Sequence, residues 1–230
     1  MRALRDAGAT ALELGYPFSD PIADGPVLAA AADRALGNGT DWSDLVRSVR
    51  TASPVLPTAV MTYANPVVRH GLVRALAELA SAGASGLIVP DLSLEESLPW
   101  QRASQRVGLS LVLMAAPGAS ADRAARIARA SRGFLYLVAY YGTTGRASEG
   151  PAADLGPIVT AVRRAAPDRP ILLGFGVRDR RSAERALALG VDGVVVGTAL
   201  EEAIARDPSP RALGDWLREI AAARRAPAVG

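Results

Sequence analysis

Short apolar runs alternate with amphipathic stretches along most of the 230 residues. Glycine or proline marks nearly every transition between them, which indicates many short elements joined by turns. Amphipathic stretches such as residues 70–82, 120–130 and 179–188 predict helices. The runs rich in Val, Ile, Leu and Ala predict seven strands, at residues 10–14, 55–63, 86–91, 109–116, 133–139, 170–175 and 192–197.

Continuous apolar strands that alternate with helices are typical of a parallel sheet covered by helices on its outside. Seven such units without a break in composition favour a closed (β/α)8 TIM barrel over a doubly wound sheet, with residues 1–230 as a single domain. The number of strands is one short of the eight in such a barrel. Residues 1–7 read as the end of a helix that Gly8 stops. We therefore expect an α/β barrel that lacks its first strand and part of its first helix.

The absence of certain residue types narrows the chemistry. The chain has no cysteine, no lysine and one histidine, His70. Disulfides, thiolate nucleophiles, Cys-based metal sites and lysine Schiff bases are therefore excluded, as is a zinc site with several histidines. We interpret His70 as a structural residue at a helix start. Catalysis must then depend on carboxylates, hydroxyls, arginines and backbone groups, and we expect no metal and no cofactor.

The charge pattern indicates neither a nucleic-acid surface nor a membrane segment. The net charge is only +3, and the arginines are scattered without interleaved aromatic residues, so solvated helix faces explain them better than nucleic-acid binding. No run of eighteen apolar residues occurs, and charges occupy the place of a signal peptide's apolar core. The sequence thus predicts a cytoplasmic location.

Glu13 lies inside the first apolar run, and a proline-rich loop with Asp20 and Asp24 follows it. In a parallel barrel, functional groups collect at the carboxyl ends of the strands. If Leu12 and Leu14 pack outward, alternation points Glu13 into the barrel, where burial would raise its pKa and suit it to proton transfer. A glutamate merely held by an arginine is the alternative. Asp20 and Asp24 are equally compatible with turn formation and with catalysis.

Glycines after the last two strands indicate a phosphate site. "LLGFGVRD" and "VVVGTALEE" each place glycines before a helix, where barrels often bind phosphate. "YYGTTGRASEG" is a third loop that could supply hydroxyl and amide donors or act as a lid. Ordinary strand–helix turns are the alternative. "GFGVRD" is not a dinucleotide fingerprint, because Asp179 replaces its third glycine.

The chain resembles the tryptophan synthase α subunit family. The resemblance rests on "LELGYPFSDPIADGP", "MTYANP", "GLIVPDL", "GFLYLVAYYGTTG", "GFGV" and "VVVGTA", which follow the family's order over nearly the whole chain. It implies a (β/α)8 barrel that cleaves indole-3-glycerol phosphate to indole and glyceraldehyde 3-phosphate, a retro-aldol reaction without a cofactor.

The resemblance also implies roles for particular residues. Glu13 matches the acid–base glutamate, and Asp24 matches the aspartate that accepts a hydrogen bond from the indole N–H. The positions that match substrate-binding residues are Tyr63 and Tyr136, which line the pocket, Gly145, Gly176, Gly197 and Thr198 at the phosphate, and Phe175, which would pack near them.

The family implies a partner as well. Its members pass indole to a pyridoxal-phosphate β subunit in an α2β2 tetramer, and Asp20, Pro21 and Asn65 match positions on or near the docking surface. This chain departs from the family at Ala29, where the usual glutamine is missing, and at Ser93, where a proline is lost near the β interface. It also departs at its start, where about 35 residues of a typical first unit are absent. Three alternatives therefore stay open: a stand-alone lyase for secondary metabolism, an inactive homologue that only binds a partner, and another phosphate-binding barrel.

Overall fold

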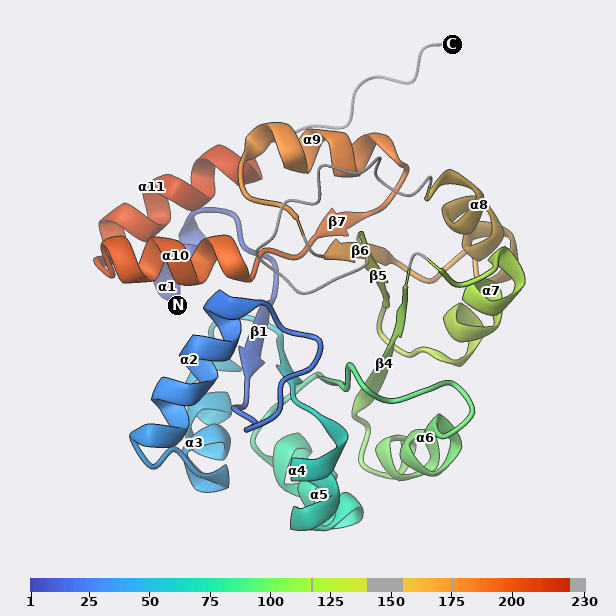
Figure 1. Ribbon diagram of the computed structural model, residues 1–230, viewed down its shortest axis with the longest axis horizontal. Helices are drawn as coiled ribbons and strands as arrows, with labels where there is room; N and C mark the ends of the chain where they lie inside the picture. Colours follow the sequence, from blue (N-terminus) through green and yellow to red (C-terminus); the bar gives the residue numbers. More distant parts are fainter. Residues whose placement is uncertain (117, 140–154, 175, 224–230) are drawn as a thin grey trace.

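The computed structural model describes residues 1–116, 118–139, 155–174 and 176–223. Within these ranges seven strands form one parallel sheet in chain order, with helices around it (Figure 1). Each strand is joined to the next by at least one helix, as parallel neighbours require. The strands are β1 (Leu12–Gly15), β2 (Thr58–Met61), β3 (Gly86–Ile88), β4 (Ser110–Ala115), β5 (Leu135–Val138), β6 (Ile171–Gly174) and β7 (Gly193–Val194).

Several helices begin at a residue whose side chain accepts from their first backbone N–H groups, or at a proline, which has no N–H group to satisfy. Asp41 and Asp179 form capping boxes, Ser120 and Ser209 accept from backbone N–H groups, and Pro26 occupies a first helical position. The helices are α1 (Arg2–Asp6), α2 (Pro26–Gly37), α3 (Trp42–Ala52), α4 (Ala64–His70), α5 (Leu72–Ser81), α6 (Ser97–Arg106), α7 (Ala121–Ala130), α8 (Gly156–Ala165), α9 (Arg180–Ala188), α10 (Thr198–Arg206) and α11 (Pro210–Ala221).

The apolar side chains form two clusters, one on each face of the sheet. The larger cluster fills the space between the strands and the surrounding helices and includes Leu76, Leu87 and Ile171, all fully buried. The smaller cluster is built around Ile88, Val112 and Tyr136 and lies inside the barrel. Alternating residues of each strand thus serve the two clusters, which places every second side chain in the interior.

The observed elements confirm the expected architecture. All seven predicted strands are present with shorter bounds, and the three predicted helices correspond to α5, α7 and α9. The prediction that His70 starts a helix is wrong. His70 ends α4, and Gly71, with φ of +93°, separates it from α5. Among the described residues, none of the helices combines the length and hydrophobicity that a membrane-spanning segment needs.

Candidate active site

Glu13 occupies the interior face of β1. It lies opposite Ala59 of β2 in the sheet register, and Ala59 packs in the interior cluster. Leu14, the next residue, packs in the outer cluster instead. Alternation along the strand therefore points the Glu13 carboxyl group into the barrel, as the sequence predicts.

The surroundings of Glu13 favour its neutral form. The crowding of protein atoms around the carboxyl group, and secondarily the negative charge of Asp24, raise the pKa of Glu13 to about 7. Glu13 is nonetheless exposed to solvent, which moderates the effect of this crowding and leaves the residue accessible to small molecules. A carboxyl group with this pKa can both accept and donate a proton near neutral pH.

Asp24 is half-buried at the end of the loop that follows β1, and Tyr63 holds it there. The Tyr63 hydroxyl donates to Asp24 Oδ2 over 2.9 Å and accepts from the Ala23 N–H over 3.0 Å. Burial raises the pKa of Asp24, while the bond from Tyr63 lowers it. The loop is thus both a structural element and the carrier of a second acid. Sequence reasoning missed this bond, because no local pattern links residues about forty positions apart.

Tyr136 extends from β5 toward the same two acids. It is 4% exposed, and burial together with the charges of Glu13 and Asp24 raises its pKa well above the usual range. Its ring fits against Gly174 of β6, where any Cβ atom would collide with the Tyr136 phenol. The fold therefore brings together the predicted residues Glu13, Asp24 and Tyr136.

The predicted phosphate-binding positions follow β6 and β7. Gly176 has φ of +89°, a conformation that favours glycine, and Gly197 is the N-cap residue of α10, which begins at Thr198. The first turn of α10 directs backbone N–H groups away from the helix end, which suits an anion. Gly145 and Phe175 lie outside the described residues, as does the loop after β5.

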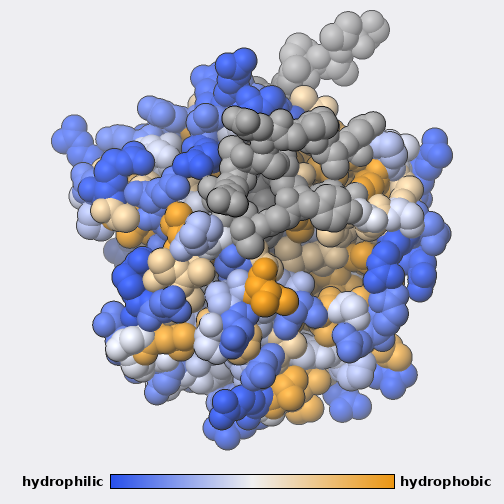
Figure 2. Space-filling view, in the orientation of Figure 1, coloured by the Kyte–Doolittle hydropathy of each residue, from blue (hydrophilic) through white to orange (hydrophobic). Residues whose placement is uncertain are grey.

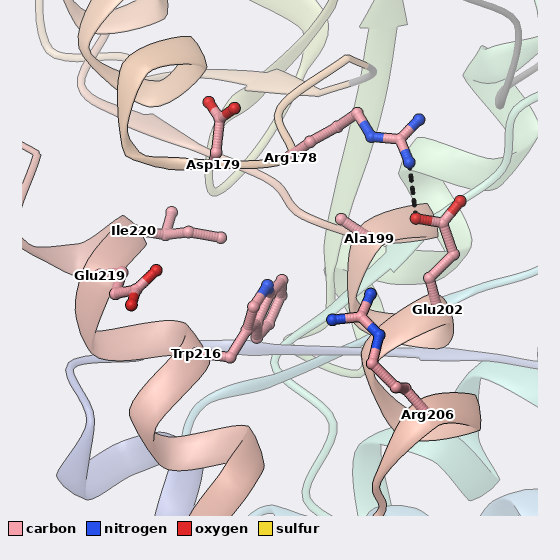
Figure 3. A pocket seen from close by; sticks show the side chains of 8 residues that line it. All are labelled: Arg178, Asp179, Ala199, Glu202, Arg206, Trp216, Glu219 and Ile220. Carbon is pink, nitrogen blue, oxygen red and sulfur yellow. Dashed lines mark hydrogen bonds and ion pairs between the residues drawn. The ribbon is translucent and has the colours of Figure 1, made fainter.

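A separate hollow of about 330 Å³ lies between α10, α11 and the start of α9 (Figure 3). Arg178 and Ala199 line it, and they are close neighbours in sequence of Gly176 and Thr198. Arg178 Nη2 donates to Glu202 Oε2 over 2.7 Å across the hollow, and Trp216 projects into it from α11 (Figure 3). Neither Glu13 nor Asp24 is among its lining residues, so this hollow is separate from the two acids.

His70 belongs to a structural cluster on the outside of the barrel. Its ring stacks on Trp42 with centroids 4.5 Å apart, and its Nε2 lies 2.8 Å from Glu78 Oε2. The Trp42 Nε1–H and the Arg74 guanidinium also donate to Glu78. Since these contacts join α3, α4 and α5, the position of His70 agrees with a structural role.

On the face of the molecule shown in Figure 2, the coloured surface is mostly hydrophilic, with separate apolar patches rather than one continuous apolar area. Ile22, in the loop that carries Asp24, is 77% exposed, and Val68 of α4 is 58% exposed. Ile22 is two residues before Asp24 in the chain, and Val68 is three residues after Asn65.

A parallel barrel that has two interacting acids, Glu13 on β1 and Asp24 on the loop after it, and a helix N-terminus after its last strand is typical of the class of barrel enzymes that catalyse reactions at the carboxyl ends of their strands. Comparison with known proteins identifies the family within this class. The family model described as tryptophan synthase alpha chain matches residues 1–221. The chain belongs to the tryptophan synthase alpha chain family.

Individual relatives agree with this assignment. The tryptophan synthase alpha chain of Synechococcus elongatus is 42% identical over 200 residues, which cover 86% of this chain and 74% of the relative. The tryptophan synthase alpha chain of Synechocystis is 40% identical over 226 residues, which cover 96% of this chain and 84% of the relative. A structure of Mycobacterium tuberculosis tryptophan synthase superimposes with a TM-score of 0.86 at 36% identity. The superposition covers 98% of this chain and 85% of the chain in that structure. Members of the family are lyases that cleave indole-3-glycerol phosphate and work with a β subunit.

Proposed function

We propose that this chain cleaves indole-3-glycerol phosphate to indole and glyceraldehyde 3-phosphate, with Glu13 as the acid–base residue. The observation that carries the proposal is a carboxyl group inside the barrel whose pKa is raised to about 7 beside a second acid. Neither a Schiff base with lysine nor a cysteine-ligated zinc ion is available to this sequence. Carbon–carbon cleavage by proton transfer on the substrate itself is the route that the two acids support.

The reaction moves one proton from a hydroxyl oxygen to a ring carbon. Protonation of the indole at C3 places positive charge on the ring nitrogen, and Glu13 takes the proton of the glycerol hydroxyl next to the bond that breaks. The electron pair of that bond then enters the ring and restores neutral indole, while the hydroxyl carbon becomes the aldehyde. A group that holds and releases a proton near pH 7 serves both transfers.

Asp24 supplies the charge that this path needs. Its carboxylate accepts the hydrogen bond of the indole N–H and stabilises the positive charge that develops on the nitrogen. Tyr136 and Tyr63 line the site. Gly176, Gly197 and Thr198 hold the phosphate through backbone N–H groups, the Thr198 hydroxyl and the start of α10. By resemblance to the family, Gly145 also binds the phosphate, and Phe175 packs near the phosphate-binding residues.

We also infer that the chain docks a tryptophan synthase β subunit through the loop that carries Asp20 and Pro21 and through Asn65 of α4. The exposed side chains of Ile22 and Val68 lie beside these positions in sequence and support this surface. We infer further that residues 1–230 are one domain, since the outer apolar cluster includes residues from α3 through α11. A cytoplasmic location agrees with such an enzyme.

The test is indole release from indole-3-glycerol phosphate by the purified protein, with and without a β subunit. Release that increases when the β subunit is added supports the proposal. Release of the same size without a β subunit would identify a stand-alone lyase. Binding of a β subunit with no release in either case would favour an inactive homologue and would contradict the proposed activity.

A further inference from the structure

Tyr63 connects the end of β2 to the catalytic loop with a single hydroxyl group. The hydroxyl donates to the Asp24 carboxylate at 2.9 Å and accepts from the Ala23 N–H at 3.0 Å, so it binds two consecutive residues of the loop. Tyr63 is only 4% exposed, and water therefore competes little for these bonds. The hydroxyl uses both its donor and its acceptor capacity on the loop.

The Tyr63 ring is itself held in place. Tyr63 is the N-cap residue of α4, and the next residue, Ala64, donates its N–H to Asp91 Oδ1 at 2.9 Å. The Phe18 ring packs against the Tyr63 ring, with the two centroids 5.3 Å apart. These contacts fix the position of the Tyr63 phenol just after the end of β2. Asp24, by contrast, lies on a loop, and its carboxyl group is fixed by the bond from Tyr63.

The bond occupies one oxygen of Asp24 and leaves the other available. Oδ2 accepts from Tyr63, and Oδ1 has no hydrogen-bond partner in the part of the chain that the structure describes. We infer that Tyr63 is a positioning residue, whose hydroxyl orients Asp24 so that Oδ1 meets the indole N–H of the substrate. This inference rests on the proposed function and gives Tyr63 a role beyond lining the pocket.

Electrostatics around Asp24 support this role. The groups that face it are Glu13 of β1, Tyr136 of β5 and Tyr63 at the N-cap of α4, and the charge of Asp91 also acts on Tyr63. Burial raises the pKa of Asp24, and the bond from Tyr63 works against this rise. Burial and the nearby acids raise the pKa of Tyr63 above its usual range, so the phenol stays a donor at every working pH.

The first experiment compares Tyr63→Phe with Tyr16→Phe. Tyr16 lies at the start of the same loop and packs edge-on against Trp42, and its hydroxyl makes no hydrogen bond in the described part of the chain. We expect Tyr63→Phe to lower kcat for indole release about tenfold, with a smaller change in KM, as for a contact made mainly in the transition state. We also expect the acid limb of the pH profile of kcat to move to higher pH in Tyr63→Phe, because the bond that lowers the pKa of Asp24 is lost. Equal profiles for both variants would overturn the inference.

A double-mutant cycle separates positioning from direct substrate contact. The ligand is 3-(indol-3-yl)propyl phosphate, which keeps the ring N–H and the phosphate but cannot be cleaved, so all four proteins can be compared by calorimetry. We expect Tyr63→Phe to weaken binding about fivefold alone and less than about twofold in an Asp24→Asn background, since residues that act as a unit are not additive. Equal losses in both backgrounds would show that Tyr63 contacts the ligand itself and would contradict positioning.

A measurement on the free protein keeps this inference separate from the proposed function. The pKa of the Asp24 carboxyl group, followed by ¹³C chemical shift, is expected to rise in Tyr63→Phe and to stay unchanged in Tyr16→Phe. No rise would overturn the inference even if the wild-type protein cleaves the substrate. Conversely, a rise in a protein without cleavage activity would support the bond to Asp24 while the proposed function failed.

Discussion

At the scale of single residues, the side chain of Glu13 allows a direct test of acid–base catalysis. Glutamine keeps its shape but cannot take up a proton. We expect Glu13→Gln to lower kcat for indole release by about 10²- to 10⁴-fold, the range typical of general acid–base groups. Binding of 3-(indol-3-yl)propyl phosphate should persist. Steady-state kinetics measures turnover and calorimetry measures binding. Glu184→Gln on α9 is the control, since the Glu184 carboxylate pairs with Arg180 on the same helix. Normal turnover in Glu13→Gln would contradict the role of Glu13.

The raised pKa of Glu13 also makes folding stability depend on pH. The pKa rises from 4.5 to about 7 on folding, so between these values the folded state binds more protons than the unfolded state. Stability contributed by protonated Glu13 is therefore fully present below pH 4.5 and is lost as the pH rises through about 7. Because solvent contact screens the interaction, we expect the free energy of unfolding to change by on the order of 1 kcal/mol over this pH range.

Glu13→Gln removes this pH dependence, which gives a second test. Relative to the wild type, the variant should gain stability on going from pH 4.5 to pH 8, while all other titrating groups cancel in the comparison. Urea unfolding at the two pH values measures the difference. A stability difference between variant and wild type that is the same at both pH values would mean that folding does not perturb Glu13.

At the scale of elements, β5 and β6 fit together through one glycine. A Cβ atom on residue 174 would collide with the Tyr136 phenol, so Gly174→Ala forces that ring out of its place. We expect a loss of stability of about 1–3 kcal/mol, as for other overpacked sites, together with reduced kcat/KM. Chemical unfolding and kinetics check both. Gly37→Ala is the control, because no atom lies within 4 Å of its new Cβ. An unaffected Gly174→Ala would contradict the close fit.

The sequence predicts the elements better than it predicts their contacts. Apolar runs mark all seven strands, because buried parallel strands need continuous apolar residues, and alternation along β1 correctly places Glu13 in the interior. The bridge from Tyr63 to Ala23 and Asp24 could not be read from the sequence, since it depends on how a loop folds back onto a strand end. The predicted helix over residues 70–82 starts too early, because His70 belongs to α4, which was not predicted, and Gly71 separates α4 from α5 with φ of +93°.

At the scale of the whole molecule, the proposed function gives the loop after β1 two roles, one in the active site and one in partner binding. Asp24 faces the interior, whereas Ile22, two residues earlier, is 77% exposed. We expect Ile22→Asp to weaken binding to a tryptophan synthase β subunit about tenfold or more, because a charge at an apolar contact is costly on desolvation. Calorimetry or ultracentrifugation measures the affinity.

Leu189→Asp is the matched control for this surface. Leu189 is 36% exposed at the C-terminal end of α9, which points away from the carboxyl ends of the strands. The Leu189→Asp variant should therefore leave the affinity for the β subunit unchanged. Equal affinities for wild type and Ile22→Asp would remove the loop from the docking surface. Equal losses in both variants would indicate that added charge, rather than position, weakens the complex.

The order of the sheet has a consequence for how the protein moves. Glu13 and Asp24 belong to β1 and its loop, whereas Gly197 and Thr198 follow β7, and these two strands are the outermost in the described sheet order. β7 has only two residues and pairs with β6 alone in that order, so its amides should exchange with solvent by local opening. A ligand whose indole lies at Asp24 and whose phosphate lies at Thr198 would contact residues that follow β1 and residues that follow β7, and would restrict the motion of both. Its binding should therefore slow deuterium uptake at residues 193–200 more than in the central strands, and hydrogen–deuterium exchange by mass spectrometry would record this.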